Sequence, residues 1–290
     1  MKFKVVSNYD SDKNMHNTVL NCFENKTNLQ LTQDDDYEYL VVINGTRSPI
    51  KTSRDKVIGI LQEPIGNINY DRNLHFYCSR IISQSKEMFG EYRGIRENLL
   101  PMFYRHHDTT HRDYFTDFND FENRKKLCLI VSSISSPNNP SWTNHNYQKR
   151  HTFIRRLLDS DLEFDFYGNG WNLSDHRYKG STSNKHETLR DYEYSIAIEN
   201  ACEDNYVSEK FFDCILNNTV PLYYGCPNVK DFYNRNSFHN IDIEGVDVVD
   251  QIRQLTSQSS KSISENVLES KDMYFKGSNI FNLIKEITCE

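Results

Sequence analysis

The sequence lacks any long hydrophobic run, and it also lacks an excess of positive charge. None of its 290 residues falls in an apolar stretch long enough to cross a membrane, which takes about 18 residues or more. Residues 1–10 contain no apolar segment typical of a signal peptide. The formal net charge is −7, which argues against a protein that coats nucleic acid. We therefore expect no transmembrane segment, no secretion signal and no nucleic-acid partner.

Cysteine is present, but without the paired spacing of a disulfide framework. The seven cysteines are an odd number, and Cys128 and Cys214 lie within apolar runs. Free buried thiols are typical of a reducing compartment. We therefore expect a cytoplasmic protein, in a bacterial cytosol or, for a viral protein, in the host cytoplasm.

Apolar residues make up only 37% of the chain, but 13% of its residues are aromatic. Large aromatic side chains bury wide areas when they pack, and disordered chains contain few of them. At about 100–200 residues per domain, the length predicts two folded domains.

Short apolar runs alternate with helical patterns along the chain. The run Leu-Cys-Leu-Ile-Val at 127–131 is apolar throughout, as in a parallel strand that is covered on both faces. Such alternation predicts βαβ units and a doubly wound α/β fold. The expected strands are 2–7, 39–43, 57–61, 80–83, 127–132, 162–167, 195–198, 220–224 and 238–241, and the clearest helices are 147–159 and 209–216.

The segment from Tyr104 to Lys126 interrupts this alternation because it is polar, charged and aromatic without periodicity. We place the domain boundary at its end. The prediction is an N-terminal domain over 1–125, which includes a linker from about residue 104, a second domain over 126–272 and a helical tail over 273–290.

The strongest chemical signal runs from Tyr194 to Asp213. A buried strand ends in Glu199 and Asn200, and after a short loop a helix begins near Ser208 with Lys210 in its first turn. Ligands of open α/β sheets bind at the carboxyl ends of strands, and helix N-termini favour anions. A lysine in the first turn opposes the helix dipole. Its presence therefore predicts a bound anion such as a diphosphate.

This stretch resembles the donor-binding motif of the α1,3/4-fucosyltransferases, glycosyltransferase family 10. The spacing is kept, with mild departures at Ile198, Asn205 and Ser208, and so many matched positions are far more specific than a single glycine motif. The likeness is strongest over about 127–232 and thinner over 57–104. The matching segments are 198–200, 205–210, 218–221, 225–227, 127–133, 149–157, 164–168, 57–64 and 100–104.

The resemblance implies a GT-B architecture of two Rossmann-like domains that face a cleft. It implies an inverting enzyme that moves L-fucose from GDP-β-L-fucose to a hydroxyl of an oligosaccharide acceptor, α1,3 to a GlcNAc or Glc unit. Glu63 is expected as the catalytic base, because an attacking hydroxyl must lose its proton. Arg150 and Lys210 are expected to neutralise the leaving diphosphate.

The donor pocket is expected to include Asn200, Tyr206 and Glu209, together with Arg150 and Lys210. Glu199 is left with two equal interpretations, a structural carboxylate at the strand end or a direct donor contact. No metal ligands and no required cofactor are expected, since side chains supply the positive charge, although a non-essential divalent cation is compatible with this scheme. We expect a monomer or a homodimer.

Two other clusters have simpler interpretations. Asp34-Asp35-Asp36 precedes an expected strand, so a solvated turn is favoured over a metal site. The residues His106, His107, Asp108, His111 and Asp113 have metal-ligand types, but the segment has no apolar periodicity and a solvated linker is favoured.

Three alternative functions remain open at the level of sequence. The first is a related GT-B enzyme that uses another nucleotide sugar. The second is a metal-dependent hydrolase built on the histidine cluster. The third is a non-catalytic protein that binds a sugar nucleotide or a glycan, which would have no use for Glu63 as a base.

Overall fold

The computed structural model describes residues 1–67, 69–99, 112–118, 120–121, 124–132, 146–277 and 279–289. Contacts between Cα atoms divide the chain into two compact units. Unit 1 comprises Met1–Tyr114, Glu203–Ser208 and Tyr274–Glu290, and unit 2 comprises Phe115–Cys202 and Glu209–Met273. The sequence prediction placed the boundary after residue 125 and treated 273–290 as a separate tail. The segments Glu203–Ser208 and Tyr274–Glu290 join unit 1 through long-range contacts that a reading along the chain does not reveal.

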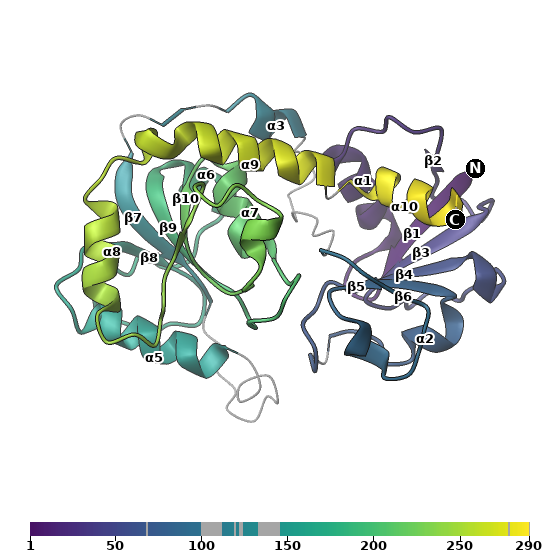
Figure 1. Ribbon diagram of the computed structural model, residues 1–290, viewed down its shortest axis with the longest axis horizontal. Helices are drawn as coiled ribbons and strands as arrows, with labels where there is room; N and C mark the ends of the chain where they lie inside the picture. Colours follow the sequence, from purple (N-terminus) through teal and green to yellow (C-terminus); the bar gives the residue numbers. More distant parts are fainter. Residues whose placement is uncertain are drawn as a thin grey trace. The chain divides into compact units, whose positions relative to one another are not determined.

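Unit 1 is built on a parallel sheet of six strands over the described residues, in the order β2-β1-β3-β4-β5-β6 (Figure 1). Helices α1 and α10 cover one face, where the rings of Phe3 and Phe281 meet edge to face with centroids 5.6 Å apart. The bounds are β1 Lys2–Ser7, α1 Asp12–Cys22, β2 Gln30–Leu31, β3 Tyr39–Ile43, β4 Val57–Ile60, α2 Leu74–Tyr77, β5 Arg80–Ser83, β6 Ile95–Glu97 and α10 Ile280–Cys289, with 3-10 turns at Arg54–Lys56 and Lys86–Phe89. The short helix α3, Arg112–Thr116, begins in unit 1 and ends in unit 2.

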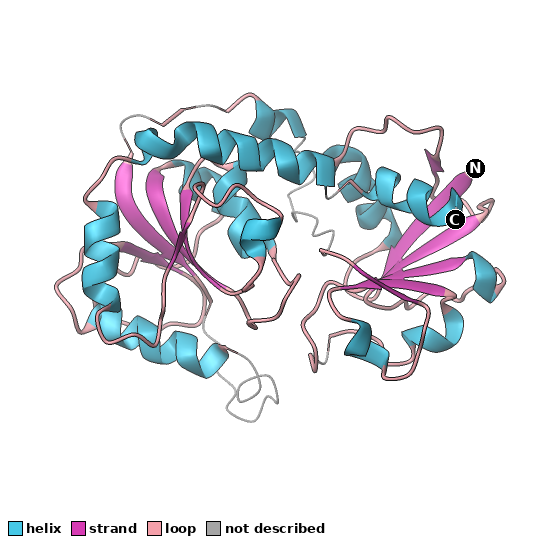
Figure 2. Ribbon diagram, viewed as in Figure 1, coloured by secondary structure: helices cyan, strands magenta, loops and turns pink. Residues whose placement is uncertain are grey.

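Unit 2 is built on a parallel sheet of five strands in its described part, in the order β11-β10-β9-β7-β8. Helices cover both faces of this sheet (Figure 2), with α5 and α8 on one side and α6, α7 and α9 on the other (Figure 1). The bounds are β7 Lys125–Ile130, α5 Tyr147–Leu158, β8 Asp165–Tyr167, α6 Lys185–Arg190, β9 Tyr192–Ile198, α7 Glu209–Leu216, β10 Val220–Tyr224, β11 His239–Asn240, α8 Val248–Thr256 and α9 Ser264–Gly277, with 3-10 turns at Val229–Asp231 and Ser260–Ile263.

All nine expected strands are present, because continuous apolar runs become strands that are buried on both faces. β1, β3, β5 and β10 match the predicted ranges residue for residue. The strand expected from 162 is wrong at its start, since β8 begins at Asp165. The carbonyl of Leu162 accepts a hydrogen bond from the Arg177 side chain at 3.0 Å rather than from a neighbouring strand.

The segment between the two expected domains is not entirely irregular. It contains the short helix α3, Arg112–Thr116, whose Phe115 is fully buried. The linker was therefore predicted wrongly at this point, because a five-residue helix is too short to show a periodic pattern.

Candidate functional site

The order of strands in unit 2 identifies the edge of the sheet where a ligand is expected. β8 pairs with one side of β7, β9 pairs with the other side, and β10 continues beyond β9. The direction in which strands are added therefore reverses between β7 and β9. In doubly wound sheets, ligands bind outside the carboxyl ends of the strands at such a point. Glu199 and Asn200 directly follow the last residue of β9.

Glu199 is a buried carboxylate that serves as the counter-charge of Lys210. Its side chain is 0% exposed, and one carboxylate oxygen lies 3.8 Å from Nζ of Lys210. The hydroxyl of Tyr223 donates a hydrogen bond to the other oxygen at 3.3 Å. A Cβ at Gly225 would lie 2.3 Å from Cγ of Glu199, so the glycine leaves room for the carboxylate. Of the two interpretations left by the sequence, this burial favours the structural carboxylate.

Lys210 and Glu209 form an ion pair in the first turn of α7. Nζ of Lys210 lies 3.0 Å from Oε1 of Glu209, and the two side chains are 18% and 42% exposed. Burial opposes the charge of Lys210, but Glu209 and Glu199 outweigh it and raise the pKa of the lysine. Burial likewise opposes the charge of Glu209, yet Lys210 and Lys185 lower the pKa of this carboxyl to about 2. Both groups are therefore charged at neutral pH.

Arg150 joins the same edge of the sheet from the first turn of α5. The residue is only 4% exposed, and its Nη1 donates a hydrogen bond to Oδ1 of Asn200 at 3.3 Å. The guanidinium lies over the ring of Tyr147, with its central carbon 4.9 Å from the ring centroid. Asn146 ties this helix end to β9, because its N–H donates to the carbonyl of Asn200 at 2.7 Å.

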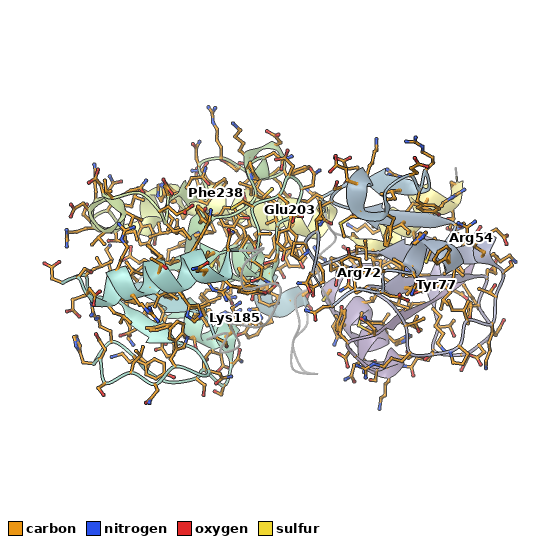
Figure 3. All side chains as sticks on the ribbon, turned by 90° about the horizontal axis from the view of Figure 1, so that it is seen from below. Arg54, Arg72, Tyr77, Lys185, Glu203 and Phe238 are labelled. Atoms are coloured by element: carbon orange, nitrogen blue, oxygen red, sulfur yellow. The ribbon has the colours of Figure 1, made fainter. Side chains whose placement is uncertain are left out.

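The sequence prediction missed Lys185, the first residue of α6 (labelled in Figure 3). Nζ of Lys185 lies 2.7 Å from a carboxylate oxygen of Asp213. Lys185 lines a cavity of about 20 Å³ together with Arg150 and Lys210, against the ends of β7 and β9. The sequence did contain a signal for this residue. Asn184 is an N-cap residue directly before Lys185, just as Ser208 stands before the first turn that contains Lys210, and both patterns mark a lysine at the start of a helix.

Glu63 belongs to unit 1, where it lies just beyond the end of β4. The side chain is half-buried, and Oε2 accepts a hydrogen bond from Nδ2 of Asn67 at 2.8 Å. Nε2 of Gln84 donates to the Glu63 carbonyl and to Oε2 of Glu203, each at 3.1 Å. The Ile65 N–H also donates to the Glu203 carboxylate at 3.1 Å. The loop that carries Glu63 is thus held at both its backbone and its side chain.

Tyr206 is also part of unit 1, in the segment Glu203–Ser208. Its side chain is 1% exposed, and the preceding Asn205 has a left-handed backbone with φ of 63°. Among the site residues expected from the sequence, the structure brings together Arg150, Glu199, Asn200, Glu209 and Lys210 in unit 2, and Glu63 and Tyr206 belong to unit 1.

The acidic run at 34–36 forms ion pairs with lysines rather than a metal cluster. Asp35 pairs with Lys4 at 3.2 Å and with Lys51 at 2.6 Å, and Asp36 pairs with Lys2. Among the described residues, no group of histidine, cysteine, aspartate or glutamate side chains could hold a metal ion. Residues 106–108 and 111 of the histidine cluster lie outside the described residues, as does the 100–104 segment.

All seven cysteines are free thiols, and five of them are buried. No helix in the described part of the chain is both long and apolar enough to span a membrane.

Comparison with known proteins identifies the family. Residues 121–262 match the family model described as glycosyltransferase family 10 (fucosyltransferase), C-terminal part. The α-(1,3)-fucosyltransferase FucT of Helicobacter pylori is 26% identical over 156 residues, which cover 52% of this chain and 33% of that protein. The human GDP-fucose protein O-fucosyltransferase 3 is 29% identical over 119 residues, covering 39% of this chain and 23% of that protein. The matched region thus spans a third or less of these relatives.

A crystal structure of an α1,3-fucosyltransferase resembles the whole chain, with a TM-score of 0.56 at 18% identity, covering 100% of this chain and 89% of the other. A structure described as α1,3-fucosyltransferase with GDP-fucose has a TM-score of 0.53 at 18% identity, over 93% and 82% of the two chains. These similarities confirm the predicted GT-B fold class of two Rossmann-like sheets. Residues 121–262 thus match glycosyltransferase family 10, the fucosyltransferase family that the sequence motif indicates.

Proposed function

We propose that this protein is an inverting fucosyltransferase that moves L-fucose from GDP-β-L-fucose to a hydroxyl of an acceptor glycan. The observation that carries the proposal is the charged cluster of Arg150, Lys210 and Glu209 at the point where strand order reverses. This cluster lies within the region that matches the family. The structural relative solved with GDP-fucose supports the same donor.

The cluster is suited to a leaving diphosphate. Arg150 offers a planar guanidinium for paired contacts to phosphate oxygens, and Lys210 offers a compact positive charge. Because Glu199 and Asn200 hold these two cations in place, little ordering is needed when the donor binds. The α7 N-terminus adds backbone N–H groups with a favourable dipole, and Glu209 is available for sugar or ribose hydroxyls. Tyr206 and Asn200 are proposed to line the donor pocket.

Glu63 is proposed as the base. It accepts the proton of the acceptor hydroxyl while the oxygen of that hydroxyl attacks the anomeric carbon of fucose. The bond from this carbon to the diphosphate oxygen breaks, and its electron pair leaves with GDP. Attack opposite the leaving group turns the β-linked donor into an α-linked product. The leaving charge is neutralised by side chains, so we propose that no cofactor is required and that a divalent cation has at most a non-essential role.

The acceptor is proposed to be an oligosaccharide that receives fucose α1,3 on a GlcNAc or Glc unit. The human relative's name specifies fucosylation of proteins, so transfer assays should test peptide acceptors as well as oligosaccharides. We propose a cytoplasmic location, because the cysteines are free thiols, and a monomer or homodimer.

A thermal-shift titration tests the donor. GDP and GDP-fucose should raise the Tm, with or without EDTA, and at a hundredfold excess over Kd the gain in unfolding free energy should be about 2.7 kcal/mol. Stabilisation by UDP-glucose but not by guanine nucleotides would show that the donor is a different nucleotide sugar, and it would leave the fold assignment unchanged. If no nucleotide stabilises the folded protein, the proposal is wrong and a glycan-binding protein or a hydrolase becomes the better explanation.

A further inference from the structure

Three positively charged side chains converge at one edge of the unit 2 sheet, each from the first turn of a different helix. Arg150 comes from α5, Lys185 from α6 and Lys210 from α7. All three line the same cavity of about 20 Å³ beside the carboxyl ends of β7 and β9. A cavity of this size holds about one water molecule, so a larger ligand would lie at its mouth and contact the groups around it.

Two of the carboxylates that balance the lysines are more deeply buried than the lysines themselves, whereas Glu209 is 42% exposed against 18% for Lys210. Asp213 is 5% exposed against 31% for its partner Lys185, and Glu199 is 0% exposed against 18% for Lys210. Asp213 and Glu199 are thus shielded from solvent. An anion that approaches this edge meets the two ammonium groups and the exposed Glu209, and not the two buried carboxylates.

Lys185 is held as a charged group close to Lys210. Burial opposes its charge, but Asp213 and Glu209 outweigh this effect and raise its pKa. Repulsion from Lys185 opposes, but does not cancel, the rise in the pKa of Lys210 that its carboxylate neighbours cause. An anion that binds between two ammonium groups is attracted by both of them and offsets their mutual repulsion, so the electrostatic free energy falls.

The backbone of α6 does not offer the same binding group. The side-chain oxygen of Asn184 already accepts hydrogen bonds from the N–H groups of His186 and Glu187, at 3.1 and 3.4 Å. The first turn is thus capped by the protein itself, and the ammonium of Lys185 is the group that remains for a ligand.

We propose that Lys185 is a third donor-binding cation, which contacts the diphosphate of the nucleotide sugar, and that Asp213 is its positioning residue. This inference rests on the proposed function and adds a residue to its donor site. A purely structural ion pair between Lys185 and Asp213 is the competing explanation.

The test uses a double variant that removes both charges of the pair. In Lys185→Gln with Asp213→Asn, two amides replace the lysine and the carboxylate, so no buried charge is left alone. Calorimetry measures the Kd of GDP, GMP and guanosine for this variant and the wild type. We expect the Kd of GDP to rise about tenfold or more, as for a lost charge-assisted hydrogen bond, while the Kd of guanosine stays unchanged. Lys185→Arg should retain most of the affinity for GDP.

A matched control removes an ion pair from the opposite end of the same strands. Lys126 and Glu193 lie 3.0 Å apart beside the starts of β7 and β9, and Lys126→Gln with Glu193→Gln should leave the Kd of GDP unchanged. If the Lys185 and Asp213 double variant binds GDP as the wild type does, the inference is overturned and the proposed donor stands. An equal loss of GDP and guanosine binding also overturns it, because that result indicates general damage. Failure of the wild type to bind GDP overturns both proposals.

Discussion

At the scale of single residues, the candidate site depends on charges that are buried together. Glu199 has no exposed surface, and such a carboxylate costs free energy unless it is paired. Lys210 supplies the partner and Tyr223 a hydrogen bond. The site is therefore organised before any ligand binds, which lowers the cost of ordering it on binding.

Glu199→Gln should change how the affinity for GDP depends on pH. Glu199 helps to raise the pKa of Lys210, and a lysine is charged at pH values below its pKa. Without that carboxylate the pKa of Lys210 falls, so its charge is lost at a lower pH. The ratio of the variant Kd to the wild-type Kd should therefore grow as the pH rises toward the ordinary lysine value of 10.5.

Tyr223→Phe is the matched control for this measurement, because it removes the hydrogen bond to Glu199 and leaves its charge in place. The affinity of Tyr223→Phe for GDP should change with pH in the same way as the affinity of the wild type. Parallel pH profiles for Glu199→Gln and the wild type would show that the carboxylate does not control the charge of Lys210.

Glu63→Gln should separate binding from transfer. The amide keeps the size of the side chain and loses the ability to accept a proton, so kcat should fall by about 10²–10⁴-fold. The Kd of GDP should stay within about twofold, since the proposed diphosphate contacts come from unit 2. Transfer assays with GDP-fucose and calorimetry with GDP provide the two numbers. A variant with wild-type kcat would exclude Glu63 as the base.

At the scale of elements, helix α9 contains a buried ionisable side chain, Lys271. Lys271 is 4% exposed, and Nζ donates hydrogen bonds to the carbonyls of Phe115 and Phe118 at 2.9 and 3.1 Å. Burial, with repulsion from Arg190 and Arg124, lowers the pKa of this lysine to about 7. The neutral amine still donates to carbonyl oxygens, so the helix keeps its contact with residues 115–118 when the proton leaves.

Lys271→Met should flatten the dependence of stability on pH. Between pH 7 and the ordinary lysine value of 10.5, the unfolded chain holds a proton that the folded chain has released. The free energy of unfolding therefore rises with pH through this window. We expect the increase in Tm from pH 7 to pH 9.5 to be smaller in the variant than in the wild type. An identical increase in Tm for both proteins would contradict the lowered pKa.

At the scale of the whole molecule, segments distant in sequence complete each unit. The last helix, α10, is part of unit 1, and α9 begins in unit 2 and ends in unit 1. Phe281 on α10 is 1% exposed and packs against Phe3 of the first strand. Asn279 adds a hydrogen bond to the Glu24 carbonyl at 2.9 Å. The fold of unit 1 therefore requires both ends of the described chain.

Phe281→Ala should destabilise unit 1 by about 3–5 kcal/mol, the usual cost of removing a buried aromatic ring. Urea unfolding followed by hydrogen exchange of the β1 and β3 amides measures this loss. Val246→Ala is the control, because Val246 is 88% exposed and should change stability by no more than about 0.5 kcal/mol. Unchanged protection of β1 in Phe281→Ala would mean that α10 contributes little to the core.

Local patterns determined the parts of the fold and of the site that could be predicted. Continuous apolar runs gave β1, β3, β5 and β10 their bounds, and a lysine in a first turn drew attention to Lys210. β6 and α6 were not predicted, because elements of three and six residues are too short to carry a clear period. The family resemblance added Glu63 and Arg150, which no local pattern marks as functional.

The sequence by itself determined the α/β class, most strands of both sheets and the family of the second unit. Only the tertiary structure decided that 203–208 and 274–290 belong to unit 1, that Glu199 is fully buried, and that Lys185 meets Asp213 beside Lys210. The physical reason is the range of the interactions. Periodicity records which face of one element is apolar, whereas burial and ion pairing depend on which distant segments pack against that face.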